Sequence, residues 1–319
     1  MADFLGIGLF IIGIMLVAGF FVIGRGSKGM GSQSTKSVPD GTISLKLAAE
    51  VETELAKLAA AGKLKAVDQI VDSLDSYSPD KQQVIRDFVI KEGIVERYET
   101  GLSDRNSKVR AINAERLGKI GGSGTAELLL KAMSDKDDEV RMSATTALKT
   151  MADPSIAGFL VNALKDPYKW LPARVAEVLV AIGAAGVPAL HRALENDDSD
   201  LKGYIIEILG EIGQSGSVLY LNQILQDSNT NLRLQAAKAL GKIGHASSIQ
   251  PLASLLEDPE VKVKVQAIRS LGLIGDPGAV QYLAPYLTVE DKAVRFAVSE
   301  ALHNLSDSNR ETKVVINYD

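Results

Sequence analysis

Hydrophobic residues recur along most of this chain with a period of about 31 residues. The clearest copies are 232–244 and 263–275, in which leucine, isoleucine and glycine fall at the same places. An aliphatic residue marks the same place in seven copies: Val109, Val140, Leu171, Leu201, Leu232, Val263 and Val294. A leucine follows eight residues after each of them: Leu117, Leu148, Leu179, Leu209, Leu240, Leu271 and Leu302. Self-similarity at a fixed period of this length is the signature of a solenoid.

Each copy contains two apolar patterns. The first has apolar residues at offsets 0, 4, 8 and 11, which fall on one face of an α-helix, here named helix A. A glycine follows helix A in most copies and can end it in the left-handed conformation. A second apolar set, such as Leu252, Leu255 and Leu256, predicts a shorter helix B. Because one antiparallel pair cannot bury its apolar face alone, we expect the pairs to stack.

Charged residues follow the same period. Aspartate stands five residues before the marker in five copies, and a basic residue follows the marker in six. The aspartates are typical of caps at the start of helix A. They can also pair with the basic residues of neighbouring repeats. We expect both, with a structural ladder formed by Asp104, Arg110, Asp135, Arg141, Asp227, Arg233, Asp258, Lys264 and Arg295.

The helix A segments share the pattern V/L-R/K-x-x-A-A-x-x-L-G-x-I-G. This pattern resembles HEAT-like repeats of the short type found in phycobilisome-lyase-related proteins. The resemblance covers about residues 78–306. It implies an all-α fold, a right-handed α-solenoid of stacked antiparallel helix pairs. Such families are mostly protein-binding scaffolds, and a minority attach or detach bilins or handle nucleic acid.

An apolar stretch precedes the repeats. Residues 4–24 contain no charged residue, and a helix of this length spans roughly 31 Å, which matches a bilayer core. A cleaved signal peptide is the alternative, but no basic residue precedes the stretch, and it is long for such a peptide. Arg25, Lys28 and Lys36 follow it. The positive-inside rule therefore predicts an outside N-terminus and repeats on the cytoplasmic side.

These observations divide the chain into six parts. We expect a short N-terminus at 1–3, a transmembrane helix at 4–24 and a flexible linker at 25–43. Capping helices and a degenerate first repeat then occupy 44–102, HEAT-like repeats 103–306, and a C-terminal tail 307–319. The tail has too little apolar periodicity for a full helix B. We expect it either to be disordered or to cover the open end of the stack.

Composition argues against catalysis. The chain has no cysteine, which excludes disulfides, thiolate metal sites and cysteine nucleophiles. Its three histidines, His191, His245 and His303, fall in different repeats, so we expect ordinary helix or cap roles and no metal site. No catalytic constellation and no cofactor motif is present. Lys and Arg are interleaved with Asp and Glu, and the net charge is −5, so we expect no nucleic-acid partner.

The regular pattern is interrupted in the third and fourth copies. Pro172 takes the basic position, so we expect helix A there to begin near Leu171. Aromatic residues, scarce elsewhere, gather around this break and in the sixth repeat. Tyrosine and tryptophan favour interfaces, so the candidate partner-binding residues are Tyr168, Trp170, Tyr204, Tyr220, Tyr282 and Tyr286. Filling gaps between repeats is the alternative role for each of them.

The leading hypothesis is a membrane-anchored scaffold or adaptor that is not an enzyme. Its solenoid would bind protein partners that are themselves membrane-associated, while residues 4–24 contact the lipid bilayer. A bilin-chromophore lyase or chaperone is the first alternative, drawn from the family resemblance. A nucleic-acid-binding HEAT protein is the second.

Overall fold

The computed structural model describes residues 40–121, 124–166, 171–196 and 198–316. Within these ranges the regular secondary structure is entirely helical, with no strand. The expected transmembrane helix at 4–24 lies outside the described residues. The chain forms two compact units, of which the first ends at Arg97 and the second begins at Tyr98.

The first unit contains the helices expected before the regular repeats. They are α2 (Asp40–Ala60), α3 (Leu64–Asp72), the 3-10 turn η1 (Leu74–Ser76) and α4 (Pro79–Lys91), followed by the start of α5 (Ile94–Gly101). Leu55, Ile70 and Phe88 form part of its buried core. Helix α2 begins at Asp40, inside the expected linker 25–43, so the helical part of the chain begins earlier than the sequence predicts. Once the helix formers after it nucleate a helix, adding Asp40 to Thr42 requires only propagation.

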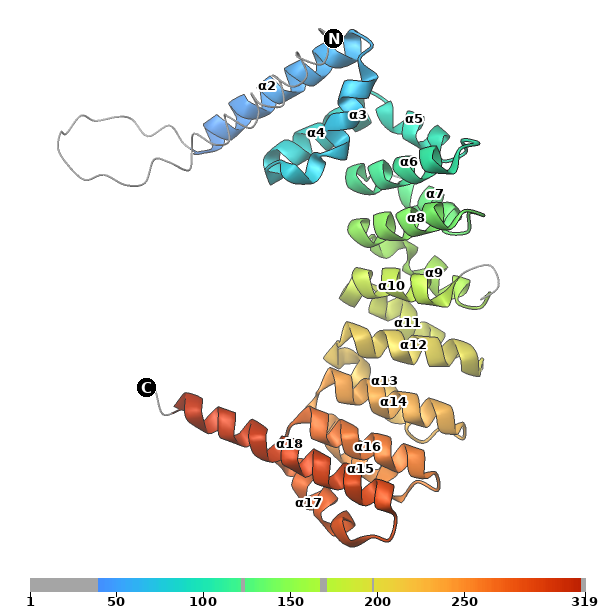
Figure 1. The fold of residues 1–319 in the computed structure, drawn as a ribbon, viewed down its shortest axis with the longest axis vertical. Helices are drawn as coiled ribbons and strands as arrows, with labels where there is room; N and C mark the ends of the chain where they lie inside the picture. Colours follow the sequence, from blue (N-terminus) through green and yellow to red (C-terminus); the bar gives the residue numbers. More distant parts are fainter. Residues whose placement is uncertain (1–39, 122–123, 167–170, 197, 317–319) are drawn as a thin grey trace, which may run out of the picture. The chain divides into compact units, whose positions relative to one another are not determined.

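The second unit contains the phased A helices. They lie one after another along the stack in Figure 1. Their bounds are α6 (Ser107–Ile120), α8 (Asp138–Met151), α10 (Pro172–Ile182), α12 (Ser199–Ile212), α14 (Thr230–Ile243), α16 (Val261–Ile274) and α18 (Lys292–Ile316). Each contains its marker residue except α10, which begins at Pro172 as the sequence predicts. Leu171 is therefore the residue before the helix and is 55% exposed. It does not share the core role of the buried markers Val140, Leu201, Leu232, Val263 and Val294.

Short B helices alternate with the A helices. They are α7 (Thr125–Ala132), α9 (Ala157–Ala163), α11 (Val187–Ala193), α13 (Val218–Ile224), α15 (Ile249–Ser254) and α17 (Val280–Leu283). Five begin from a 3-10 turn: η2 (Pro154–Ile156), η3 (Gly183–Gly186), η4 (Ser215–Ser217), η5 (Ala246–Ser248) and η7 (Pro277–Ala279). Two 3-10 segments, η6 (Leu255–Glu257) and η8 (Ala284–Thr288), follow B helices. Gly213, Gly244 and Gly275 end A helices with φ near +70°, which glycine adopts without strain.

The periodic leucines form the core of the stack. Leu117, Leu148, Leu179, Leu209, Leu240 and Leu271 are completely buried. The leucines of the B helices, such as Leu160, Leu221 and Leu252, are buried against them. Leu302, in the last A helix, is only half-buried. Within the described residues no further B helix follows α18, so Leu302 lacks the packing partner that the earlier leucines have.

The segment after the last repeat differs from the expected separate tail at 307–319. Helix α18 continues from Lys292 to Ile316 and is 25 residues long, whereas α14 and α16 have 14. No glycine follows Leu305, the place where glycine ends most other A helices. The helix can therefore propagate through the polar residues that follow.

One described stretch is long and apolar enough, by length and composition alone, to cross a membrane. Pro172–Ala193 has 22 residues and a mean hydropathy of 1.6. It comprises α10, η3 and α11, and its chain direction changes at Gly183, where φ is +64°. Val178, Leu179 and Leu190 within it are buried in the stack. Packing in the repeat core accounts for its apolar composition.

Candidate protein-binding surface

Two rungs of the charge ladder join neighbouring repeats. The Arg110 guanidinium donates to both carboxylate oxygens of Asp135, with Nε to Oδ2 at 2.8 Å and Nη2 to Oδ1 at 2.7 Å. Arg233 holds Asp258 in the same way, at 2.7 and 3.0 Å. Each arginine also donates from Nη1 to a backbone carbonyl of its own repeat. These buried, bidentate contacts fix how one repeat sits on the next.

The rungs change the acidity of both carboxylates. Hydrogen bonds from Arg110 lower the pKa of Asp135. Burial alone would raise the pKa of Asp258, but hydrogen bonds from Arg233 and from the Glu260 amide outweigh burial, so its pKa is lowered. Both groups are therefore held in the charged form.

The other ladder residues behave differently. Arg141 donates to the Asp135 carbonyl at 2.7 Å and to the Asp138 carboxylate of its own helix at 2.9 Å. Arg295 donates to two backbone carbonyls just before α18. Lys264 lies near enough to Asp258 to help lower the pKa of that carboxyl group. Arginine therefore forms a bidentate pair with aspartate at two steps of the ladder. Arg141 and Arg295 instead donate to backbone carbonyls at their steps.

The expected capping role falls on other residues. The side chains of Asp104, Asp135, Asp227 and Asp258 each accept the amide two residues later and so form a turn before the helix. The residues that cap helix A stand two positions further on: Asn106, Asp137, Asp198 and Asn229. Capping by the ladder aspartates is therefore wrong, because helix A begins several residues after them. The recurrent Asn or Asp three residues before the marker was the missed signal.

The candidate aromatic residues are dispersed over the repeats. Tyr168 and Trp170 lie outside the described residues. Tyr204 is half-buried in α12, and Tyr282 is half-buried in α17. Tyr286 donates to Glu257, and burial together with this hydrogen bond raises its pKa to about 12. Because α17 ends at Leu283 and Tyr286 lies in η8, Tyr282 and Tyr286 do not share one α-helical face.

Tyr220 takes part in a cluster that the sequence did not reveal. Its ring stacks on His191, with 3.9 Å between centroids and 23° between planes. His191 Nε2 lies 3.0 Å from Ser217 Oγ, and burial lowers the pKa of His191. Ser217 is completely buried and cannot reach a substrate. The described residues also hold no group of three or more His, Cys, Asp or Glu side chains arranged for a metal ion. We interpret the cluster as a structural joint between α11 and α13.

A column of apolar side chains runs along the B helices. Its members share one place in the repeat, the residue immediately before the buried leucine of helix B. They are Leu128, Phe159, Ala189, Tyr220, Pro251 and Tyr282, and each is at least partly exposed. The column is most exposed at Phe159, at 48%, and at Tyr220, at 41%. The 31-residue period of the sequence could have located the whole column. The search for aromatic residues singled out only Tyr220 and Tyr282 among its members.

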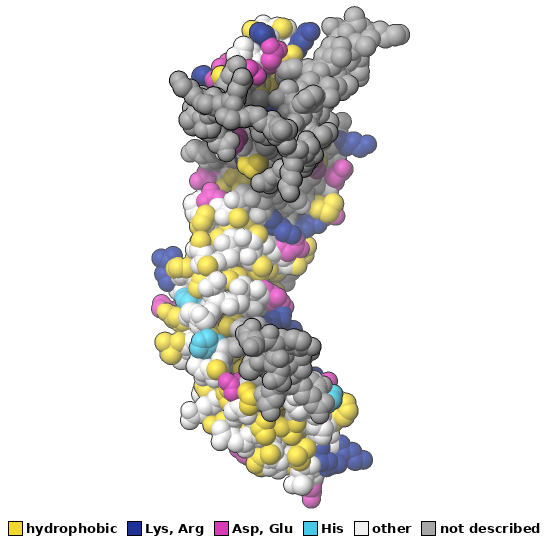
Figure 2. All heavy atoms as spheres, turned by 90° about the vertical axis from the view of Figure 1, so that its left-hand side faces the viewer, with side chains coloured by type: hydrophobic (Ala, Val, Ile, Leu, Met, Phe, Trp, Pro, Cys, Tyr) yellow, Lys and Arg dark blue, Asp and Glu magenta, His cyan; other side chains and the backbone are white. Residues whose placement is uncertain are grey.

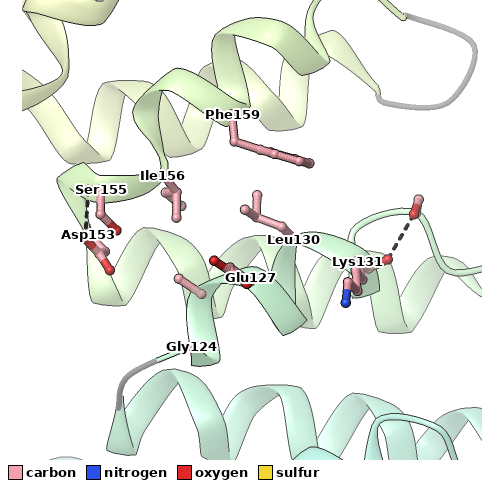
Figure 3. Close-up of a pocket in the computed structure, with 10 residues that line it drawn as sticks. Gly124, Glu127, Leu130, Lys131, Asp153, Ser155, Ile156 and Phe159 are labelled. Atoms are coloured by element: carbon pink, nitrogen blue, oxygen red, sulfur yellow. Dashed lines mark hydrogen bonds between the residues drawn. The ribbon is translucent and has the colours of Figure 1, made fainter.

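Two clefts flank α9. The first has a volume of about 520 Å³ and lies between α7 and α9, lined by residues that include Leu130, Ile156 and Phe159. In Figure 3, Leu130 and Phe159 reach toward each other from opposite walls, with Ile156 beside them. The second, of about 410 Å³, lies between α9 and α11 and is lined by residues that include Val161 and Ala189. Such clefts between helices can receive side chains of a partner.

Elsewhere the surface mixes side-chain types. Figure 2 shows hydrophobic side chains in small groups among basic and acidic ones on one face of the molecule. Leu219, next to Tyr220, is 68% exposed and adds apolar area on α13. Small apolar groups scattered among polar ones are ordinary for a protein surface, so the apolar column and its clefts are the features that single out the B-helix side.

Comparison with solved structures finds helical stacks at low sequence identity. A mutant of Kap121p superposes with a TM-score of 0.52 at 14% identity, covering 74% of this chain and 33% of that protein. Importin beta gives 0.46 at 15% identity, covering 77% and 38%. Human deoxyhypusine hydroxylase in complex with glycerol gives 0.36 at 18% identity, covering 79% and 99%. At such identities the likeness to Kap121p supports the fold alone.

Comparison with curated proteins finds no match. A family profile described as HEAT repeats matches residues 96–180, 187–263 and 249–316, which together make up more than half of the sequence. The stacked helix pairs of the second unit agree with this match. The chain therefore belongs to the HEAT-repeat family.

Proposed function

We propose that this protein is a membrane-tethered scaffold that binds partner proteins through the B-helix side of its solenoid and acts by binding rather than by catalysis. The observation that carries the proposal is the apolar column with its two clefts. Phe159 and Tyr220 expose large apolar area where the repeat pattern does not require it for the core. Solenoids of HEAT repeats offer extended surfaces of this kind.

The tether is the second part of the proposal. Residues 4–24 form an uncharged stretch of bilayer length, followed by Arg25, Lys28 and Lys36. We assign this stretch to a single transmembrane helix, with the repeats on the cytoplasmic side. Confinement to a membrane raises the effective concentration of the solenoid for partners on the same membrane. The fine class of the repeats, the short lyase-type form, is supported by the 31-residue period.

The test compares three full-length or near full-length chains in the native membrane. They are the wild type, a chain lacking residues 1–41, and a matched full-length variant with Ile14→Lys and Val17→Lys in the centre of the stretch. We expect the wild type to sediment with membranes after alkaline washing and to cross-link to membrane proteins. Both altered chains should lose membrane retention. Retention of either altered chain would contradict the tether, and the absence of any cross-linked partner with the wild type would contradict the scaffold.

Topology has its own readout. Protease added to right-side-out vesicles should leave the repeats intact, because basic residues such as those after residue 24 favour the cytoplasmic side. Digestion of the repeats in intact vesicles would reverse the assigned orientation.

A further inference from the structure

Three consecutive B-helix segments carry no charged side chain. None of their residues is Lys, Arg, Asp, Glu or His, although charged residues make up 24% of the chain, so average composition does not account for them. Two of the earlier B helices differ, since α7 contains Glu127 and Lys131 and α11 contains Arg192. The uncharged segments contain α13, α15 and α17 and span residues 212–226, 246–256 and 277–289.

These segments are neighbours in the stack and reach solvent. Helix α13 contacts η5, the turn before α15, and α15 contacts η7, the turn before α17. Leu219 is 68% exposed and Tyr220 is 41% exposed, so burial in the core does not explain the lack of charge. The surface is here named the neutral face and is defined by the exposed or half-buried residues Leu219, Tyr220, Gln223, Gln250, Gln281 and Tyr282.

Charged residues resume directly after each segment. The first ones are Asp227, Glu257 and Glu290. Asp227 accepts the backbone amide of Asn229, and Glu257 accepts a hydrogen bond from Tyr286. Two of the three carboxylates are therefore engaged within the chain, and the six residues that define the neutral face offer no counter-ion to a charged group.

An uncharged exposed face selects partners through the cost of removing water. A charged side chain of a partner would lose water there without gaining a counter-ion, which costs more than covering an uncharged side chain. The centres of protein interfaces are depleted in charged residues and enriched in tyrosine. Tyr220 and Gln223 are three residues apart on α13 and share its exposed face. Because a glutamine amide both donates and accepts, it can pair with uncharged backbone or side-chain groups.

We propose that the neutral face binds an uncharged segment of a partner protein. Apolar side chains of that segment contact Leu219, Tyr220 and Tyr282, and its amide or hydroxyl groups pair with the glutamines. The chain has 40 acidic against 35 basic residues, so its overall charge would attract basic partners. The neutral face disfavours such partners and thereby adds specificity. This inference rests on the proposed scaffold function and names its partner chemistry.

The test uses the full-length chain in detergent and a displayed library of random peptides. Peptides of about 12 residues, at roughly 3.3 Å per residue, can cross three helices that lie about 8–10 Å apart. We expect the enriched peptides to contain fewer charged residues than the unselected library. The affinity of a synthetic copy should change by less than about twofold between roughly 50 and 500 mM salt, since no ion pair forms.

Opposite charges placed at one position give the sharpest result. Gln223→Glu and Gln223→Lys should each lower the affinity by about tenfold or more, because the peptide would cover either charge without pairing it. A face that attracts partners by charge would instead respond to the two substitutions in opposite directions. Gln223→Met adds no charge and should lose less affinity than either of them.

Asn162 provides the matched control. It is exposed and stands two residues after the buried leucine of α9, as Gln223 does in α13. Asn162→Glu and Asn162→Lys should each change the affinity by about twofold or less, because α9 lies outside the neutral face. Thermal melts of all the variants exclude loss of fold as the cause.

Several outcomes overturn the inference. They are failure to enrich any peptide, enrichment of charged peptides, opposite effects of the two charges at Gln223, and equal losses at Asn162 and Gln223. A second copy of this chain is the competing occupant. A photoreactive amino acid at Gln281 that cross-links mainly to a second copy would therefore also overturn the inference.

The scaffold function is judged separately by cross-linking in membranes. If the Gln223→Glu and Gln223→Lys chains keep the wild-type cross-linked partners, the scaffold stands and the assignment of the neutral face falls.

Discussion

The A helices pack closely in most of the second unit and less closely around the third repeat. Gly118, Gly210, Gly241 and Gly272 share one place in the repeat, and a Cβ atom added there would lie 2.5–2.9 Å from an alanine or serine of the next A helix. Lys149 and Val180 take that place in α8 and α10. The contacts of α10 with α8 and α12 are correspondingly less extensive than those between the other successive A helices. These glycines, which have no side chain, thus let neighbouring A helices pack closely and set their spacing in the regular stack.

The third repeat differs in other respects as well. Helix α10 has 11 residues instead of 14, and its marker, Leu171, is exposed. Arg174 of this helix reaches back to Asp138 of the preceding repeat at 2.5 Å, and that carboxylate is largely exposed. At two other steps of the stack, buried Arg–Asp rungs make the connection between repeats. The comparison shows that repeat position alone does not determine how much a residue contributes to the stack.

The largest expected difference concerns the leucine core. Leu240→Ala should lower the free energy of unfolding by about 2–5 kcal/mol, because it removes a completely buried side chain. Leu171→Ala, at the marker of the third repeat, should change it by less than about 0.5 kcal/mol. Chemical denaturation of the two variants measures both. Equal losses would show that the third repeat packs like the others.

The ladder gives the next difference. Asp258→Asn should cost about 1.5–3 kcal/mol, since it removes the charge that two hydrogen bonds from the buried Arg233 guanidinium engage. Asp138→Asn should cost less than about 1 kcal/mol, because that carboxylate is exposed and its pairs are solvated. The same denaturation measurement applies. A larger loss for Asp138→Asn would reverse the account of the two regions.

Valine substitutions at the glycine position of the repeat should also have different effects on stability in the two regions. Gly241→Val should destabilise the stack by about 1–3 kcal/mol, because its Cβ would lie 2.6 Å from Ser270 Oγ. Lys149→Val places the same side chain at the corresponding position of α8 and should have little effect. If both substitutions were tolerated, close packing at the glycines would not set the helix spacing.

The smallest expected effect is the pH dependence of the rungs. The pKa values of Asp135 and Asp258 are lowered in the folded protein, so their contribution to stability is present above the unfolded value, about 3.9, and is lost as pH falls through the folded values. The stability difference between wild type and Asp258→Asn should therefore be constant at neutral pH and shrink below about pH 4. A difference that grows in acid would give the opposite sign and contradict the lowered pKa.

The sequence predicted the architecture well because the period repeats the same physical constraint. Every copy except the last buries a leucine such as Leu240 against its neighbours, so the phase alone located most A helices. It predicted the binding surface less well. Aromatic content singled out Tyr220 but not Phe159, and neither the clefts nor the contact between His191 and Ser217 has a local sequence signature. These depend on distances between repeats in three dimensions, which no single segment of the sequence encodes.

The central claim is that partners bind the B-helix side of the solenoid. Photoreactive amino acids placed singly at Tyr220 on α13 and at Phe296 on α18 test it in the full chain in its native membrane. The two positions are 41% and 68% exposed, so greater exposure favours Phe296 on an A helix. The account predicts that light cross-links a partner protein from Tyr220 and much less from Phe296. Cross-linking from Phe296 alone would contradict it.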